Sequence, residues 1–380
     1  MKIAKVECEF LHIPLTIPVR ETSFEYGVAL VTLTTEDGVR GTGFIREHDF
    51  QAQSARQSVL NDIAPLLKRL SGPDLVPGYF WHEASFDMPR DYRAHVGVVT
   101  RAMSAVDQAL WDIYGQETGQ PVYKLLGGSQ PEIDLYVTYG LNIYTEEEEM
   151  EAARRLLAEG FAAFKIQGLD ADRGRDFAHD ARRIEKLREA VGPEARIILD
   201  GRNNYSLYQA IELANAIRPY NVAFFDEPLY GKDPVALQRF KEACPWMMVA
   251  GRTRGGNIYD ARDLITSGGV NLMGVNVLDQ GGFTQGIKIA HMAQAFQLPV
   301  VTGGAWYMQN AHLIAAATNG WMTEYHGLAT AATRAIFDGA ILHDKGKLRL
   351  TDRPGLGLTI KDDAVRDAQD RAKVAAKKRG

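Results

Sequence analysis

The feature that most constrains the fold is a short apolar segment followed by an amphipathic helical segment, a unit that begins near residue 134 and occurs eight times. Short apolar runs that alternate with helices are typical of parallel β/α units, and eight units in about 200 residues favour a closed barrel over an open doubly wound sheet. We therefore predict an α/β protein built on a (β/α)8-type TIM barrel. The expected strands are residues 134–139, 161–166, 196–200, 222–226, 247–251, 272–277, 299–302 and 322–325.

The residues before and after this repeat have a different character. Residues 1–50 read as an antiparallel meander, and residues 51–127 read as helices. The tail from residue 347 has a mixed-charge, weakly helical end that we expect to be solvated. We predict an α+β capping domain of residues 1–127, completed by residues 347–380, over a barrel domain of residues 128–346.

Composition and charge exclude several classes of protein. The 380 residues are 46% hydrophobic, so the chain can bury one large core and a smaller accessory core. A formal net charge of −5 argues against a nucleic-acid partner. Cys8 and Cys244 are too few for a disulfide framework, the first residues lack the apolar core of a signal peptide, and no apolar run reaches a membrane span of about 18 residues. We expect a cytoplasmic protein without a membrane partner.

Four of the predicted strands end in polar motifs, namely Lys165-Ile-Gln167, Asp200-Gly-Arg202, Asp226-Glu227-Pro228 and Gly251-Arg252. The carboxyl ends of barrel strands meet at one rim, where barrel enzymes place their active sites. Two further motifs are Ala109-Leu-Trp-Asp-Ile113 followed by Pro121-Val-Tyr-Lys-Leu-Leu-Gly-Gly128, and Pro354-Gly-Leu-Gly357. With these motifs the whole chain resembles the enolase superfamily, in its mandelate racemase and muconate-lactonizing branch.

The resemblance implies an enolase-like modified barrel in which the third, fourth and fifth strands each supply an acidic ligand for one Mg²⁺. Here the third ligand position is Arg252. Arginine has only N–H donors, whereas Mg²⁺ requires oxygen ligands. We therefore predict that no cofactor is bound and that the guanidinium replaces the metal by donating to Asp200 and Asp226. A purely structural salt bridge is one alternative for Arg252. Another keeps Mg²⁺ on Asp200, Asp226 and Glu227, but neighbouring strand residues face opposite sides, so we expect Glu227 to be a structural partner.

The positions that the resemblance assigns to proton transfer are also altered. The second strand of family members ends in Lys-x-Lys, and here it gives Lys165 and Gln167, of which Gln167 cannot exchange a proton. The sixth-strand acid/base position is Asn276, and the seventh-strand histidine position is Gly303. Racemisation needs proton donors on both faces of a carbon, so these residues favour a lyase or a one-base isomerase over a racemase.

The remaining candidates line the same rim. As the base we consider Lys165, Asp226, His326 and Tyr139, in that order; neutralisation of Asp200 is the alternative role for Lys165. The resemblance makes Glu324 an acid that donates to the substrate carboxylate, and residues 324 and 326 share a face of their strand. A second cap loop offers Tyr92 and His95. The predicted substrate-binding residues are Arg202, Arg252, Gln167, Asn276, Tyr26 and Trp306.

The predicted function is an enzyme that abstracts the proton α to the carboxylate of a small molecule and stabilises the resulting enolate, as a lyase, dehydratase or one-base isomerase. One alternative is a racemase, epimerase or cycloisomerase that retains Mg²⁺. The other is a barrel that has lost catalysis and binds an anionic metabolite. Family precedent also suggests a homo-oligomer.

Overall fold

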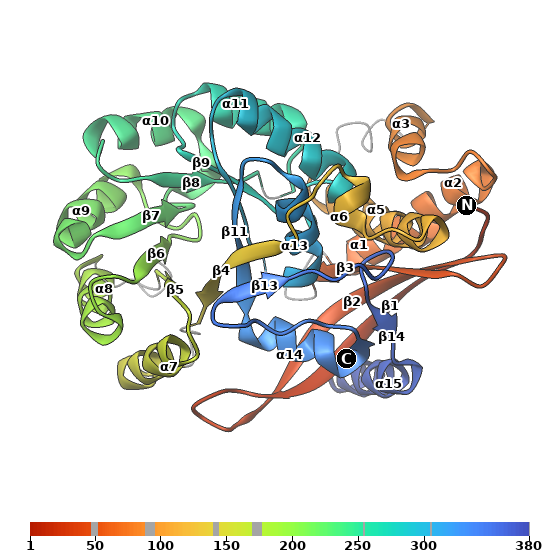
Figure 1. Ribbon diagram of the computed structural model, residues 1–380, viewed down its shortest axis with the longest axis horizontal. Coiled ribbons are helices and arrows are strands. Elements are labelled where there is room, and N and C mark those ends of the chain that lie inside the picture. Colours follow the sequence, from red (N-terminus) through yellow and green to blue (C-terminus); the bar gives the residue numbers. More distant parts are fainter. Residues whose placement is uncertain are drawn as a thin grey trace.

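The structure is a computed structural model that describes residues 1–46, 52–87, 96–139, 144–168, 177–253, 255–304 and 306–379. Eight parallel strands form a sheet that closes on itself through the pairing of its first and last members, which confirms the predicted barrel (Figure 1). These strands are β4 (Glu132–Thr138), β5 (Ala163–Gln167), β6 (Arg196–Asp200), β7 (Val222–Asp226), β8 (Val249–Gly251), β9 (Leu272–Val275), β10 (Val300–Thr302) and β11 (Gly320–His326).

Helices follow the strands and surround the barrel, and their beginnings are encoded locally. Thr145 and Glu148 form a capping box at the start of the first of them, and Asp233 caps another by accepting the backbone N–H of Val235. The helices are α7 (Glu146–Ala158), α8 (Phe177–Val191), α9 (Leu207–Ile217), α10 (Pro234–Ala243), α11 (Ile258–Thr266), α12 (Gly282–Ala295), α13 (Tyr307–Ala316) and α14 (Gly327–Ile336), with short 3₁₀ turns η3 (Arg218–Tyr220) and η4 (Tyr230–Lys232).

The N-terminal region forms an α+β cap beside the barrel, as predicted (Figure 1). Its antiparallel sheet consists of β1 (Ile3–Thr16), β2 (Ser23–Thr35) and β3 (Arg40–Arg46). The cap helices are α1 (Ala52–Gln57), a π-helical turn η1 (Ser58–Ile63), α2 (Ala64–Leu70), α3 (Pro77–Asp87), α5 (Val98–Thr118) and α6 (Val122–Leu125). The domain boundaries at residues 127 and 347 stay predictions.

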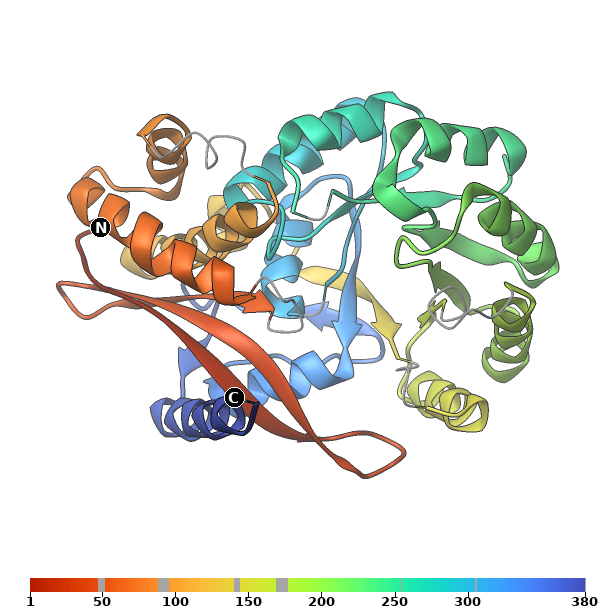
Figure 2. The same cartoon turned by 180° about the vertical axis from the view of Figure 1, so that it is seen from behind.

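The C-terminal tail is more integrated than its composition suggested. Its first strand, β13 (Lys347–Arg349), pairs antiparallel with β4 of the barrel, and β12 (Phe337–Asp338) pairs with β14 (Thr359–Ile360). Helix α15 (Asp362–Arg379) lies beside β1 of the cap in both views (Figures 1 and 2). Val365, Ala368 and Ala372 of this helix are buried, so one face of it is not solvated.

The hairpin of β1 and β2 reaches from the cap to the barrel rim, near the start of α7 (Figure 2). The hydroxyl of Tyr144 donates to the Pro18 carbonyl at 2.6 Å, and Arg20 Nε lies 2.9 Å from both carboxylate oxygens of Glu148. These bonds hold the tip of the hairpin against the barrel. Among the described residues, no helix has the length and apolar character needed to cross a membrane.

Candidate active site

The barrel interior has an apolar floor to which every strand contributes one residue. These residues form one buried cluster, which comprises Tyr136, Ala163, Ile198, Phe224, Ala250, Leu272, Val301 and Met322. Side chains two positions apart in a strand share a face, so the residues two positions further along also point inward, nearer the carboxyl rim. On six strands these are Thr138, Lys165, Asp200, Asp226, Arg252 and Glu324, and all six are buried.

The ion pairs at the centre of this polar layer involve Asp226 and two cations. Lys165 Nζ lies 2.6 Å from Asp226 Oδ2 and 2.9 Å from Asp200 Oδ2. Arg252 Nη2 donates to the same Asp226 Oδ2 at 2.5 Å, and Arg252 Nε lies 3.8 Å from Glu227 Oε2. Both cations therefore bind one oxygen of Asp226. The other oxygen, Oδ1, is buried and has no hydrogen-bond partner among the described residues.

Burial and charge shift the pKa values of these groups. Burial alone would lower the pKa of Lys165, but the Asp200 and Asp226 carboxylates outweigh it and raise that pKa well above its ordinary value. The pKa of Arg252 is raised in the same way, because the attraction of Asp226 and Glu227 exceeds the effect of burial. Burial raises the pKa of Asp226 despite Arg252 and Lys165. Lys165 is therefore an ammonium ion at neutral pH, which suits charge stabilisation better than proton abstraction.

Glu227 corrects one expectation. It was predicted to face away from Asp226 because adjacent strand residues alternate, but β7 ends at Asp226 and Glu227 has a left-handed backbone with φ of 48°. The alternation rule no longer applies after this turn. Ligand oxygens of Glu227, Asp200 and Asp226 lie within 4.8 Å of one another, and all three residues are buried. Asn203 Nδ2 donates to Glu227 Oε1 at 3.1 Å.

These carboxylates fit a hard divalent cation. They offer oxygen atoms, which are the ligands that Mg²⁺ prefers, and the unpartnered Oδ1 of Asp226 is a buried acceptor that lacks a donor. Neither Lys165 nor Arg252 blocks that oxygen, because both contact Oδ2. The presence of Arg252 at the end of the fifth strand therefore does not remove a carboxylate site, since Glu227 joins the two aspartates.

The eighth strand brings Glu324 and His326 to the same rim. Thr138 Oγ1 donates to Glu324 Oε1 at 2.5 Å, and the backbone N–H of Gly304 donates to Oε2. Both carboxylate oxygens of Glu324 are thus held in place. His326 is half-buried, pairs in register with Thr138, and follows Glu324 by two residues on the inward face of β11.

Several predicted residues lie away from the charged cluster. Tyr139 follows inward-facing Thr138 by one residue and lies in the outer apolar layer, edge-on to Phe164. Burial raises its pKa well above the ordinary value, and its hydroxyl has no hydrogen-bond partner among the described residues. The structure therefore does not bring Tyr139 to the cluster as a base, because strand alternation points it outward.

Tyr26 and Trp306 belong to an aromatic group between cap and barrel. Trp306 is fully buried, stacks on Phe44 of β3 with ring centroids 4.1 Å apart, and meets Tyr26 of β2 edge-on at 6.1 Å. Gln167 pairs in register with Asp200 and is half-buried. The backbone N–H of Arg202 donates to Asp200 Oδ1 at 3.0 Å. Tyr92 and His95 lie outside the described residues.

Three residues of the barrel interior and its rim, Asn310, Gln280 and Tyr136, were not found from the sequence. Asn310 on α13 bonds to Asn276, and Gln280 bonds to the backbone N–H of Asn276 at 2.5 Å. Tyr136 donates to the Thr302 carbonyl at 2.6 Å, and its ring centroid lies 5.5 Å from Lys165 Nζ. Only Tyr136 carried a usable signal, because it precedes Thr138 by two residues on the same strand face.

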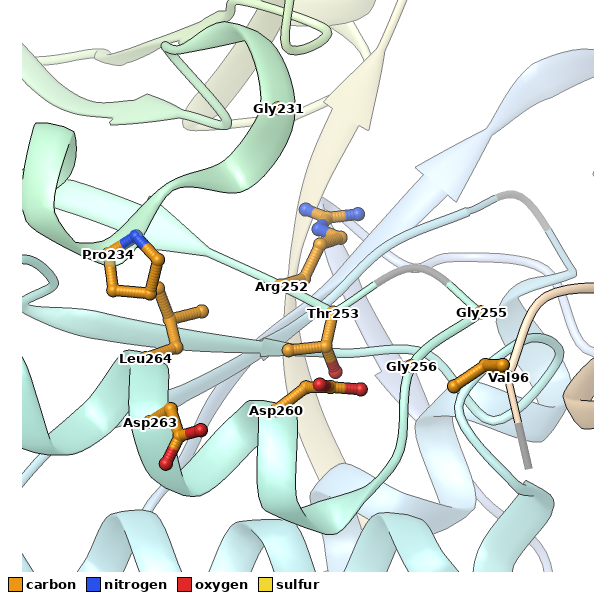
Figure 3. Close-up of a pocket in the computed structure, with 10 residues that line it drawn as sticks. All are labelled: Val96, Gly231, Pro234, Arg252, Thr253, Gly255, Gly256, Asp260, Asp263 and Leu264. Atoms are coloured by element: carbon orange, nitrogen blue, oxygen red, sulfur yellow. The ribbon is translucent and has the colours of Figure 1, made fainter. Parts of the chain in front are cut away.

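A cavity of about 440 Å³ lies beside the cluster, between the segments that follow β7 and β8 (Figure 3). Arg252 is part of its wall, yet its guanidinium is directed away from the acidic residues of α11, Asp260 and Asp263 (Figure 3). The charged group of Arg252 therefore belongs to the barrel interior. The other lining residues are Val96, Gly231, Pro234, Thr253, Gly255, Gly256 and Leu264.

Comparison with known families covers nearly the whole chain. Residues 2–127 match the family described as mandelate racemase / muconate lactonizing enzyme, N-terminal domain. Residues 148–364 match the family described as enolase C-terminal domain-like. The two matches fall on the cap and on the barrel, respectively.

Two similar proteins are named as a dehydratase and a cycloisomerase, and one similar solved structure is named as a racemase. An arabinonate dehydratase from Saccharolobus solfataricus is 30% identical over 274 residues, which cover 70% of this chain and 71% of that protein. A 3,6-anhydro-alpha-L-galactonate cycloisomerase from Streptomyces coelicolor is 26% identical over 370 residues, which cover 94% of this chain and 97% of that protein. The crystal structure of a racemase from Streptomyces coelicolor A3(2) with bound magnesium superposes with a TM-score of 0.84 at 25% identity, covering 96% of this chain and 99% of that one.

These findings correct the prediction that no cofactor is bound. A similar solved structure contains magnesium, and the present chain gathers Asp200, Asp226 and Glu227 at one buried point. The physical reason for the error is that Arg252 occupies the expected third ligand position, so a site on Asp200, Asp226 and Glu227 was given only as an alternative. The backbone turn at Glu227 supplies the third carboxylate of that alternative.

Proposed function

Because the chain belongs to the enolase superfamily, in its mandelate racemase and muconate lactonizing branch, we propose that it is a lyase or isomerase of small sugar acids, acting as a dehydratase or a cycloisomerase. The names of the relatives support this substrate class. The observation that carries the proposal is the buried group of Asp200, Asp226 and Glu227, flanked by Lys165 and Arg252, at the carboxyl rim of a barrel.

Asp200, Asp226 and Glu227 would hold Mg²⁺, which supplies positive charge beside a substrate carboxylate when it is bound. The protein adds its own positive charge next to that position. Lys165 and Arg252 are both buried and both charged, and they are held in fixed positions by Asp226. Fixed cations lower the barrier where negative charge develops during loss of an α-proton.

The proton acceptor that we propose is His326. Lys165 is engaged with two carboxylates and carries a proton, Asp226 is bound by two cations, and Tyr139 faces outward. His326 is half-buried on the inward face of β11. Imidazole exchanges a proton near neutral pH, as a general base must. A single base of this kind is compatible with elimination of water or with cycloisomerisation.

The test is a panel of five- and six-carbon aldonates and aldarates incubated in D₂O with MgCl₂ and monitored by ¹H NMR. We expect loss of the C2 proton signal with at least one acid, formation of a product, and loss of both when EDTA removes Mg²⁺. His326→Asn should abolish exchange. His179→Asn should leave exchange unchanged, because His179 lies on α8 and its Nε2 is 2.9 Å from Glu146 of α7, away from the barrel interior. Binding of an acid without any exchange or product would favour the metabolite-binding alternative.

The homo-oligomer and the cytoplasmic location remain predictions. Light scattering of the purified chain would measure its oligomeric state. Fractionation of the source cells would determine its location.

A further inference from the structure

The orientation of the Asn310 side chain is fixed by backbone groups. Asn310 is fully buried on α13, and its Oδ1 accepts the backbone N–H of Val277 at 3.0 Å. Its Nδ2 donates to the Gly303 carbonyl at 3.1 Å and to Asn276 Oδ1 at 3.3 Å. A backbone N–H can only donate and a carbonyl can only accept, so the oxygen and nitrogen of the Asn310 amide cannot be exchanged.

The fixed Asn310 in turn fixes Asn276. Asn276 Oδ1 receives Asn310 Nδ2 and also the backbone N–H of Leu278 at 3.1 Å. Both acceptor positions of this oxygen are thus used. The Nδ2 group of Asn276 lies on the other side of the amide and donates to no acceptor among the described residues. Asn276 can therefore act on a ligand only as a hydrogen-bond donor.

Two consecutive glycines border this donor and the guanidinium of Arg252, one glycine for each group. A Cβ atom at Gly304, whose φ is +102°, would lie 2.0 Å from Asn276 Nδ2. A Cβ atom at Gly303 would lie 2.6 Å from Arg252 Nη1. The absence of side chains at both positions leaves room for the two donor groups. Arg252 Nη1 also has no acceptor among the described residues, since the guanidinium binds Asp226 through Nη2.

We propose that Arg252 Nη1 and Asn276 Nδ2 form a subsite for an unprotonated oxygen of the substrate, such as a carboxylate or carbonyl oxygen, with Asn310 as its positioning residue. This inference rests on the proposed function, because it assigns part of the sugar acid to the rim segment at Gly303 and Gly304. A charged donor and a neutral donor that border adjacent residues of one rim segment select an acceptor and disfavour a hydroxyl that must itself donate. Of the residues concerned, Asn276 and Gly303 occupy positions where the resemblance expected acid/base residues, and Arg252 occupies the expected position of a metal ligand.

The test measures binding, so it does not require turnover. The probes are arabinonate, gluconate and galactonate, titrated calorimetrically in MgCl₂, and the acid with the lowest Kd is used further. Asn276→Asp keeps the acceptor and replaces the donor by a carboxylate oxygen. Asn310→Asp removes the donor to Asn276 and should turn the Asn276 amide around. We expect both variants to raise Kd about tenfold or more, the scale of a lost charge-assisted or well-placed hydrogen bond.

The matched control is Asn319→Asp. Asn319 Nδ2 also donates to two backbone carbonyls, those of Ala290 and Leu298, but Asn319 directly precedes β11 and accepts the N–H of Val300 at the amino end of β10, away from the carboxyl rim. Its Kd should stay within twofold of wild type. If Asn310→Asp does not fold, NMR of the wild-type protein provides the test. The side-chain amide signal of Asn276 can be assigned by its loss in Asn276→Asp or by selective labelling. This signal should move downfield when the acid saturates the site.

A folded Asn276→Asp that binds the probe within twofold of wild type would overturn the proposal, as would an amide signal that does not move. Failure of all three acids to bind would overturn it together with the proposed function. Binding that Asn276→Asp weakens, without exchange or product in D₂O, would support the subsite and remove only the proposed catalysis. A turnover rate that is unchanged in Asn276→Asp would contradict the subsite but not the proposed function.

Discussion

Replacing Arg252 by methionine should destabilise the protein in the absence of metal. The guanidinium is 3% exposed, donates to Asp226 Oδ2 at 2.5 Å and lies 3.8 Å from Glu227 Oε2. Methionine fills similar space without charge, so Lys165, which contacts Asp200 and Asp226 but not Glu227, would be left to neutralise the carboxylates. Removing one partner of a buried ion pair costs about 3 kcal/mol. With about 2.1 cal/mol/K of unfolding entropy per residue, a chain of this length should melt roughly 4 °C lower.

The assay is thermal unfolding in EDTA and again in MgCl₂, with Arg262→Met as the control. Arg262 is an exposed arginine of α11 that pairs with Asp263 at 2.7 Å, and exposed pairs contribute less than about 1 kcal/mol. We also expect MgCl₂ to stabilise Arg252→Met more than wild type, because the carboxylates then have an excess of negative charge. A variant that melts within 1 °C of wild type in EDTA would refute the argument that Arg252 neutralises this cluster.

Three further outcomes follow from the geometry. Lys165→Met should lower the rate of C2 deuterium exchange about 10²-fold or more, because it removes a fixed cation beside Asp226. If NMR finds an exchange rate within fivefold of wild type, another group and not Lys165 stabilises the developing negative charge. Tyr139→Phe should leave kcat/KM within about threefold and the melting temperature equal or higher, since its buried hydroxyl lacks a partner among the described residues; a large loss of activity would restore Tyr139 as a candidate base. Burial lowers the pKa of His312 from 6.5 to about 4, so its neutral form stabilises the fold above pH 6.5, and about 3 kcal/mol of unfolding free energy should be lost as the pH falls through 6.5 towards 4. Urea unfolding of wild type and His312→Asn at pH 7 and pH 4.5 measures this loss, and parallel profiles would contradict it.

The fold could be predicted because its signals are local. Each barrel strand is an apolar run that ends near the first polar residue facing the rim. The helix starts are also encoded locally, because the capping box at Thr145 and the N-cap at Asp233 each involve residues within four positions of one another. The rim residues Lys165, Asp200, Asp226 and Arg252 were placed correctly on strand ends for the same reason. Their spacing in the sequence then follows from one strand and one helix per unit.

The site could be predicted only where strand alternation holds. Glu227 was placed on the wrong side because a left-handed backbone at one residue turned its carboxylate towards the aspartates. Tyr139 was placed inward although it lies one residue beyond Thr138, and counting the alternation from Tyr136 would have assigned it to the outer layer. Asn310 contacts Asn276 across 34 residues of sequence, and no local spacing encodes that contact.

Arg252 and Gly303 are best understood as one structural change. A side chain at Gly303 would place its Cβ 2.6 Å from Arg252 Nη1, so a histidine at the end of the seventh strand would require the guanidinium of Arg252 to move. Likewise, a Cβ at Gly304 would lie 2.0 Å from Asn276 Nδ2. At this rim, the amides of Asn276 and Asn310 are bonded and oriented, while Arg252 Nη1 borders Gly303 and Asn276 Nδ2 borders Gly304. The altered residues therefore form an ordered set, which favours a site rebuilt for a different substrate oxygen over a barrel in decay.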